Sequence, residues 1–474
     1  MLVFDFIHDE SPLIAESLNY LIDINQLDKN DFSIVTMGKR WHKFFYDFQN
    51  TSFTKFCENL DNEDINVERQ INRISKEYDT TNLFGVDRLL IKKPIEYQNK
   101  VLVYTFLFYE NLFSQKEITH YFTTGIAYMY NLASYQVAKR YNVKHISFYD
   151  IRNPYQKRTT VSFGVKNRFD NVVDDYKKYK SKKVTPEMKE ELDKFRNKPV
   201  QPTYMKNLIN KQTINSILIK EFFIRFKKYY FDKNSKYDYF SRNPFGLSYE
   251  KLRKLFYSKL LQLFSAKIFQ KSDIENDKYF LFPIHMYPEA STLVLSKYYV
   301  NQLETIINVS KTLPSHICLY VKEHKSAMGE RKFNFYKELK KYSNIKVLSF
   351  KENTFDLINK SLGIITLSST VGWEGLLLKK PVMVLGDVFY NDTGLTLPIN
   401  SYNKLKKTVG KIVFKNLSTL TNEYDDQLAY FVYCLNKNSF PFEFNVFKLD
   451  ITKKLLLEDN VKNCAECIAS VIKN

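Results

Sequence analysis

The sequence predicts an α/β protein whose second half forms a doubly wound, parallel sheet. Two observations lead to this fold class. From Lys278 onward, short apolar runs alternate with amphipathic segments, and polar side chains directly follow four of the runs. Such alternation of strand-like and helix-like segments is typical of a parallel sheet with helices on both faces. The length of 474 residues favours more than one domain.

The alternating segments define a Rossmann-like domain over residues 275–415. Its expected strands are 279–284, 317–321, 345–350, 363–368 and 381–386. Its expected helices lie between them, where apolar residues recur at helical spacing: 297–311, 331–342, 354–361 and 371–379.

Residues 1–170 are predicted to form another α/β domain with a less regular pattern. Its clearest unit is a strand at 120–124, a helix from about 126 to 141 and a strand at 145–149. The apolar run 101–108 fits either a buried strand or the start of a helix. The N-terminus has early acidic residues and no basic segment, and no apolar run is long enough to span a bilayer. We therefore expect a cytoplasmic protein without a signal peptide.

Residues 171–274 are predicted to form a basic, helical connection between the two domains. The stretch 171–270 contains 23 Lys and Arg against 10 Asp and Glu, a net charge of +13 within a total of +19. Such a surface attracts anions, which predicts peripheral contact with an anionic inner membrane; the alternative is a solvated, Lys-rich helical face. We expect no nucleic acid partner, because no motif for one is visible. Residues 416–474 are predicted as helices that pack back on the domain junction.

Polar residues follow four strands of the 275–415 domain, at the strand ends where open parallel sheets bind ligands. They are His285 after the first strand, Lys322 and His324 after the second, the segment 368–372 after the fourth, and Tyr390 after the fifth. One such end would mean little, whereas four together predict a ligand site.

The strongest motif in this set is the run Ser368, Ser369, Thr370 and Gly372 at the start of a predicted helix. A helix N-terminus presents unpaired N–H groups and a partial positive charge, and small hydroxyl residues let a phosphate approach them. The alternative is an ordinary Ser/Thr cap. Glu374, one turn further on, either accepts hydrogen bonds from ribose hydroxyls or offsets the helix dipole.

Several motifs of other enzyme classes are absent from the sequence. Without an Asp-x-Asp pair we expect no catalytic metal, and without a Gly-x-x-x-x-Gly-Lys-[Ser/Thr] loop we expect no NTPase. The absence of Gly-x-Gly-x-x-Gly argues against nicotinamide chemistry. Cys464 and Cys467 form a single Cys-x-x-Cys with no second pair nearby, so zinc or redox use is not expected.

Residues 363–396, GIITLSSTVGWEGLLLKKPVMVLGDVFYNDTGLT, resemble the capsule polysaccharide synthesis family, which includes bacterial β-Kdo (3-deoxy-manno-octulosonate) transferases. The positions that match the family's pattern are Ser369, Thr370, Gly372, Glu374, Leu376, Pro381, Val382, Gly386, Phe389, Tyr390, Gly394, Leu395 and Thr396. In the segment YVKEHKSAMGER, Lys322, His324, Gly329 and Arg331 match as well, while Lys325 replaces the usual Pro. The resemblance covers roughly 279–400.

The resemblance implies a GT-B fold, meaning two Rossmann-like domains with parallel sheets. It also implies a glycosyltransferase that takes a CMP-linked, Kdo-like sugar as its donor substrate and uses neither a metal nor another cofactor. The acceptor would be a capsule or surface glycan, or a glycolipid. Relatives carry an acidic residue and an Arg after a central N-terminal strand, to which Asp150 and Arg152 correspond. Catalytic roles are expected for Asp150, or for Glu110 in its place, and for His324, which is placed to act on the leaving phosphate.

Two other functions remain open from the sequence. The first is a sugar-nucleotide epimerase of the same fold, which would use the nucleotide sugar without an acceptor. The second is a non-enzymatic protein that binds anionic glycan or nucleic acid through its basic region, where Lys and Arg alternate with aromatic residues. Steep salt dependence without nucleotide-sugar binding would identify the second alternative.

Overall fold

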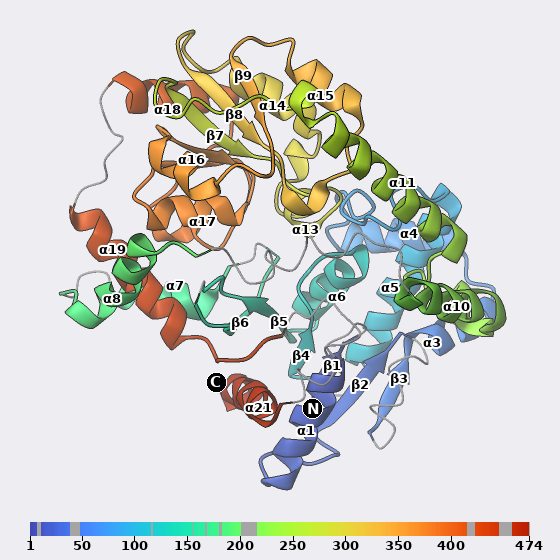
Figure 1. The fold of residues 1–474 in the computed structure, drawn as a ribbon. Coiled ribbons are helices and arrows are strands. Elements are labelled where there is room, and N and C mark those ends of the chain that lie inside the picture. The colour runs from blue at the N-terminus through green and yellow to red at the C-terminus, as the bar shows by residue number, and fades with distance from the viewer. Residues whose placement is uncertain are drawn as a thin grey trace. The chain divides into compact units, whose positions relative to one another are not determined.

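The computed structural model describes residues 1–6, 11–37, 48–114, 117–153, 155–165, 168–179, 183–200, 216–414, 422–444 and 457–473. These residues form two compact units, each built on its own six-stranded sheet (Figure 1). Unit 1 comprises 1–171, 216–244 and 436–474, and unit 2 comprises 172–215 and 245–435. The segment 171–274 is therefore divided between the units, and the chain crosses between them four times.

The sheet of unit 1 has the strand order β3-β2-β1-β4-β5-β6. Its strands are β1 (Leu2–Asp5), β2 (Phe32–Thr36), β3 (Asn50–Ser52), β4 (His120–Thr123), β5 (Lys144–Asp150) and β6 (Thr159–Ser162). All neighbours are parallel except β5 and β6. The helices of this unit are α1 (Ser11–Asp23), α3 (Phe53–Asn62), α4 (Val67–Glu77), α5 (Ile95–Ser114), α6 (Met129–Arg140), α10 (Ser216–Phe231) and α21 (Glu458–Lys473).

The end of the chain returns to unit 1, where α21 packs against α1 (Figure 1). Cys464, Cys467 and Ile468 of α21 join Leu13 and Leu18 of α1 in one apolar cluster. Burial raises the pKa of both thiols, which is what an apolar environment does to an ionisable side chain. The Cys-x-x-Cys motif is therefore part of the helix's apolar face.

The sheet of unit 2 has the order β12-β11-β10-β7-β8-β9, and every pairing in it is parallel. Its strands are β7 (Tyr279–Pro283), β8 (Cys318–Lys322), β9 (Ile345–Leu348), β10 (Gly363–Thr366), β11 (Val382–Val384) and β12 (Leu397–Pro398). Buried apolar residues make up most of the first five, as expected where helices cover both faces of a parallel sheet.

The helices of unit 2 include the four predicted between its strands, here α14 (Gln302–Ser310), α15 (Phe333–Leu339), α16 (Thr354–Lys360) and α17 (Thr370–Leu377). The others are α7 (Asp170–Tyr179), α8 (Pro186–Asn197), α11 (Pro244–Leu263), α12 (Ser265–Ile268), α13 (Ala290–Leu293), α18 (Tyr402–Phe414) and α19 (Asn422–Lys437), the first, third and last of which extend across a unit boundary. Two parallel α/β units with covering helices confirm the predicted fold class. The run 101–108, which the sequence left open, lies within the long helix α5.

The predicted C-terminal helices at 416–474 are represented by α19 and α21. Residues 415–421, 445–456 and 474 lie outside the described part of the chain. No helix among the described residues is both long enough and apolar enough to cross a lipid bilayer.

Candidate functional site

Three neighbouring strands of unit 2 bring the predicted site residues to one edge of the sheet. β7 lies between β10 and β8, and parallel pairing aligns their carboxyl ends. His285 follows β7, Lys322 ends β8, and Ser368 follows β10. Because neighbouring strands are about 4.8 Å apart, side chains from β8 and β10 are separated by about two strand spacings.

His285 connects the ends of β7 and β10. Its Nε2 accepts a hydrogen bond from the backbone N–H of Ser368 at 3.1 Å, so the ring proton sits on Nδ1. Burial, and then the nearby charges of His324 and Arg331, lower the pKa of His285 to about 3, which keeps the ring neutral. Nδ1 is buried and has no hydrogen-bond partner among the described residues. The backbone of Pro283 opposes this lowering of the His285 pKa.

A buried ion pair shapes the loop after β8. Glu323 is 1% exposed and accepts hydrogen bonds from Arg331 at 2.7 Å and from the hydroxyl of Tyr336 at 2.6 Å. The same guanidinium donates to the backbone carbonyl of His285. Gln302 exchanges hydrogen bonds with the backbone of His285 as well, at 2.7 and 3.0 Å. These contacts give Arg331 a positioning role.

His324 caps a short turn in this loop through one of its ring nitrogens. Its Nδ1 accepts from the backbone N–H of Ser326 at 3.1 Å, which is the local cap that competes with a binding role. Burial, followed by the charges of Arg331 and Lys322, lowers the pKa of His324 to about 4. A neutral ring that accepts at Nδ1 carries its proton on Nε2. The cap therefore leaves Nε2–H as a hydrogen-bond donor.

Lys322 and Glu374 form an electrostatic pair at this edge of the sheet. Burial lowers the pKa of Lys322 to about 8, and Glu374 is the largest charge opposing that shift. Burial raises the pKa of Glu374 to about 8, with Lys322 opposing it. Glu374 is buried on α17, and Lys322 is partly exposed at the end of β8. Desolvation outweighs the mutual attraction on both side chains.

The start of α17 is capped by Ser369 and fixed by a hydrogen bond from Tyr390. Ser369 is the N-cap residue, and its hydroxyl accepts from the backbone N–H of Val371 at 3.1 Å. The buried hydroxyl of Tyr390 donates to the carbonyl oxygen of Ser369 at 2.7 Å. A Cβ on Gly372 would lie 2.3 Å from that hydroxyl, so this position requires glycine. The side chain of Ser368 donates to the carbonyl of Ser291 at 2.9 Å. The Ser368 hydroxyl and the backbone N–H groups of Val371 and Gly372 are thus engaged within the protein, the latter two with Ser369.

The predicted catalytic carboxylates belong to unit 1. Asp150 ends β5 and is partly exposed, and its Oδ1 accepts from the backbone N–H of Arg152 at 2.6 Å. Arg152 has a left-handed backbone, with φ of 59°. Glu110 lies on α5, where Arg73 and Tyr78 donate to its oxygens at 2.7–2.9 Å. Glu110 is therefore engaged in a structural ion pair.

A buried carboxylate that the sequence did not indicate lies at the carboxyl end of β1. Asp5 is 1% exposed, and its Oδ2 accepts from the hydroxyls of Tyr109, Tyr121 and Tyr130 at 2.8, 2.5 and 3.0 Å. Burial raises the pKa of Asp5 to about 6, against the opposing effect of the three hydrogen bonds. The only sequence signal was an acid at the end of a short apolar run.

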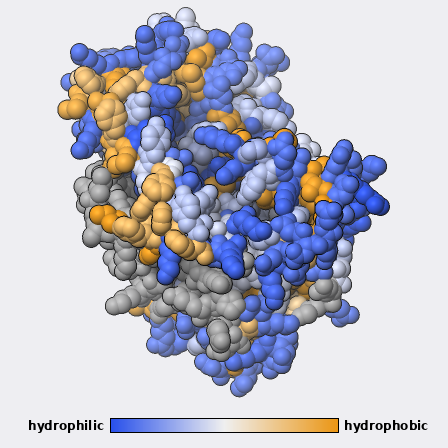
Figure 2. Space-filling view, turned by 90° about the vertical axis from the view of Figure 1, so that its right-hand side faces the viewer, coloured by the Kyte–Doolittle hydropathy of each residue, from blue (hydrophilic) through white to orange (hydrophobic). Residues whose placement is uncertain are grey.

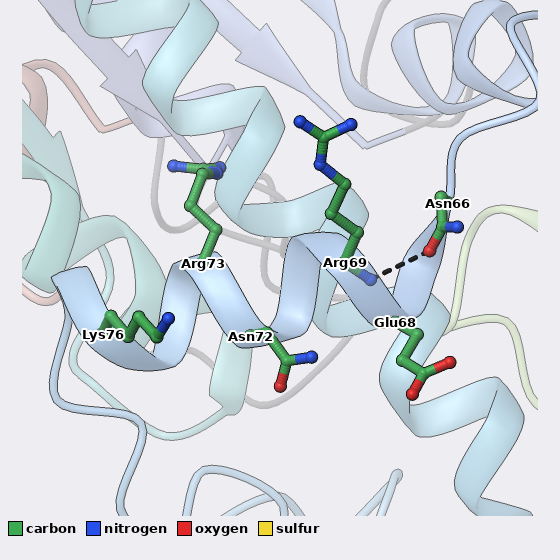
Figure 3. Close-up of a pocket in the computed structure, with 6 residues that line it drawn as sticks. All are labelled: Asn66, Glu68, Arg69, Asn72, Arg73 and Lys76. Carbon is green, nitrogen blue, oxygen red and sulfur yellow. Dashed lines mark hydrogen bonds between the residues drawn. The ribbon is translucent and has the colours of Figure 1, made fainter.

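An open hollow of about 510 Å³ lies over α4 in unit 1. Figure 3 shows Arg69 and Arg73 extending from one side of the helix and Glu68 and Asn72 from the other. All of its lining residues come from this helix or its cap residue Asn66, and Arg73 is paired with Glu110. The hollow is a helix surface, and we do not treat it as the candidate site.

The two Rossmann-like units and the cluster on the second sheet define a protein of the GT-B class. Residues 218–418 match the family described as "Capsule polysaccharide biosynthesis protein". This match includes every candidate residue of unit 2 and confirms the predicted resemblance to the capsule polysaccharide synthesis family. No match to the sequence was found among curated proteins.

The chain is similar to several solved structures at low sequence identity. The β-Kdo 2,7 transferase of KpsC from Thermosulfurimonas dismutans is 13% identical, covering 77% of this chain and 89% of that one, with a TM-score of 0.34. A glycosyltransferase from Rickettsia africae is 13% identical, covering 100% and 99%, with a TM-score of 0.29. A UDP-GlcNAc 2-epimerase from Methanocaldococcus jannaschii is 12% identical, covering 91% and 99%, with a TM-score of 0.26. Glycosyltransferases and an epimerase thus both occur among these structures.

Proposed function

We propose that this chain is a glycosyltransferase of capsule polysaccharide synthesis that moves a sugar from a CMP-linked, Kdo-like donor to a capsule or surface glycan. The observation that carries the proposal is the cluster of Lys322, His324, His285 and the α17 N-terminus within the family-matched stretch. These groups supply positive charge and N–H donors at one sheet edge, which suits a nucleotide phosphate.

In this proposal the cluster stabilises the leaving nucleotide. Breaking the bond between the sugar and CMP leaves negative charge on the phosphate, and fixed donors lower the cost of that charge. Lys322 supplies the point charge, His324 Nε2–H supplies a hydrogen bond, and the N-terminus of α17 adds its partial positive charge. Glu374, whose pKa burial raises to about 8, is available to hydrogen-bond the ribose hydroxyls. In this proposal transfer proceeds without a metal, because these groups neutralise the phosphate charge that a carboxylate-bound cation would otherwise neutralise.

We assign the acceptor-side carboxylate to Asp150. It is the last residue of β5 in unit 1 and keeps one oxygen that the Arg152 N–H does not use. Glu110 is the weaker choice, since Arg73 and Tyr78 already engage its oxygens. Arg152, whose backbone N–H orients Asp150, is proposed to contact substrate through its side chain. A carboxylate here would support the developing positive charge on the sugar or take the acceptor's proton.

The proposal also places the protein in the cytoplasm, in peripheral contact with the anionic inner membrane. The net charge of +13 over residues 171–270 supports this contact, because anionic lipid attracts basic surfaces.

Two measurements test the proposed activity. Calorimetric titration with CMP, UDP and GDP should give binding by CMP, and CMP should be released from a CMP-sugar only when an acceptor glycan is present. Conversion of a nucleotide sugar without an acceptor would identify an epimerase instead. Asp150→Asn should lower turnover at least about a hundredfold while CMP affinity stays unchanged. Glu110→Gln is the matched variant, and it should lower stability through the loss of the Arg73 pair but retain turnover.

A further inference from the structure

One face of α11 carries large apolar side chains that point away from the protein. Tyr249, Leu252, Phe256 and Leu263 are 68%, 53%, 61% and 76% exposed. Their spacings of 3, 4 and 7 residues place them on one side of the helix. We call these four residues the α11 stripe. Apolar residues at helical spacing normally face a core, so an outward stripe indicates a surface that something else covers.

The opposite face of α11 is fixed to unit 2, which sets the direction of the stripe. Lys254 donates to the carbonyl of Ser326 at 2.9 Å and pairs with Glu330 at 2.6 Å. Gly329 has φ of +84°, and a Cβ there would lie 2.2 Å from the carbonyl oxygen of Lys254. The helix therefore packs directly on the loop that carries His324, and it cannot turn its stripe inward without losing these contacts.

Basic side chains accompany the stripe. Of the four basic residues of the helix, Lys254 belongs to the face that contacts unit 2, which leaves three against one acidic residue, Glu250. Lys251 and Lys259 are exposed and Arg253 is partly exposed. Figure 2 looks onto the side where α11 lies in Figure 1 and shows apolar surface in orange beside hydrophilic surface in blue. Aromatic and Leu side chains flanked by Lys and Arg are typical of helices that lie in the interface of an anionic bilayer.

We infer that the α11 stripe docks on the surface of an anionic lipid bilayer. This inference deepens the proposed peripheral membrane contact and rests on it. A helix of 20 residues is about 30 Å long, and the stripe extends along most of it, so it would lie along the bilayer surface. The positive flanks favour acidic lipid headgroups over a neutral apolar partner. Because α11 contacts the His324 loop, docking would hold the donor site close to the membrane.

The experiment measures co-sedimentation of the full chain with vesicles of phosphatidylglycerol and phosphatidylcholine, or of phosphatidylcholine alone. The double variant Leu252→Glu/Phe256→Glu should bind the anionic vesicles at least about tenfold more weakly. Phe414→Glu is the control, because Phe414 is also in unit 2 and 72% exposed but lies on α18. It should bind as the unchanged protein does. Lys259→Glu should weaken binding about fivefold.

Unchanged vesicle binding by the double variant would overturn the inference, as would equal binding to both kinds of vesicle. A dimer in solution that the double variant dissociates, without vesicle binding, would instead make the stripe an interface between two copies. Calorimetric titration of the unchanged protein and of the double variant with CMP, without vesicles, shows whether the fold and the donor site are intact, independently of membrane binding. If the unchanged protein bound vesicles but not CMP, the proposed activity would be contradicted and the membrane inference would stand.

Discussion

The backbone N–H of Ser368 donates to Nε2 of His285 across 3.1 Å, joining the end of β10 to the end of β7. This contact turns two separate strand ends into one surface, with His324 and Lys322 on the next strand end. It also fixes the proton of His285 on a buried Nδ1 that has no described partner. The imidazole is therefore a structural acceptor at the sheet edge where we place the nucleotide.

Replacing His285 with Leu should lower the free energy of unfolding by about 1–3 kcal/mol. The Ser368 N–H would lose its acceptor, and we expect that loss to exceed any gain from a more apolar side chain. Urea unfolding monitored by circular dichroism gives the difference. His316→Leu is the control, because His316 is exposed in the same unit. Equal stability of the two variants would contradict the assigned role.

Lys322→Ala and His324→Ala should each weaken CMP binding by about ten- to a hundredfold, since each removes one charge-assisted or N–H contact. Lys325→Ala is the matched control and should change affinity less than about twofold, as expected for a surface charge. Calorimetric titration at one ionic strength compares the three variants. Wild-type affinity should also fall as the pH rises through about 8, where Lys322 loses its proton. Unchanged affinity in both variants would exclude the site.

The sequence predicted the second sheet and the residues at its edge because short-range sequence patterns indicate both. Buried parallel strands appear as continuous apolar runs, and polar residues directly follow them. The hydrogen-bond partners of these residues cannot be predicted from such short-range patterns. Gln302 reaches His285 from another element, and Arg331 bonds to Glu323 on one side and to His285 on the other. Such contacts depend on strand order, which short-range patterns do not contain.

The first unit was predicted less completely for a different reason. β1 and β3 are only four and three residues long, which is too short for a periodic pattern to emerge. The run 101–108 is apolar on all sides because α5 is buried around most of its circumference, so its pattern fits a strand equally well. Asp5 gave only a weak signal, an acid after a short apolar run, since its three tyrosine donors come from α5, β4 and α6.

Glu374 should make stability fall as the pH rises from about 4.5 to about 8. Its pKa is raised by burial from 4.5 to about 8, so over this range the folded protein holds a proton that the unfolded chain has lost. Stability then declines by at most about 1.4 kcal/mol per pH unit. Lys322 acts above this range: its pKa is lowered to about 8, so stability recovers between about pH 8 and 10.5.

Urea unfolding at several pH values tests this behaviour. Glu374→Gln removes the titrating group and should flatten the decline in stability between about pH 5 and 8. This range lies within the window between the unfolded and folded pKa values of Glu374, 4.5 and about 8. Glu304→Gln, on the exposed side of α14, should leave the wild-type slope unchanged. A slope that Glu374→Gln does not alter would mean that another group carries the pH dependence.

Gly372 should tolerate no side chain, because of its contact with Tyr390. A Cβ at Gly372 would meet the tyrosine hydroxyl at 2.3 Å and Thr366 Cγ2 at 3.1 Å. Gly372→Ala should therefore lower the free energy of unfolding by about 1–3 kcal/mol and weaken CMP binding, since the first turn of α17 must shift. Gly410→Ala is the control: it also lies in a helix of unit 2, its nearest neighbouring atom would be 4.0 Å away, and it should stabilise by about 0.5–1 kcal/mol.

Adding Tyr390→Phe to Gly372→Ala removes the clashing oxygen and should recover part of the loss, although the Ser369 carbonyl then lacks its donor. The double-mutant cycle measures this coupling. Additive losses, or a Gly372→Ala variant as stable as Gly410→Ala, would show that Tyr390 does not set the position of the helix start.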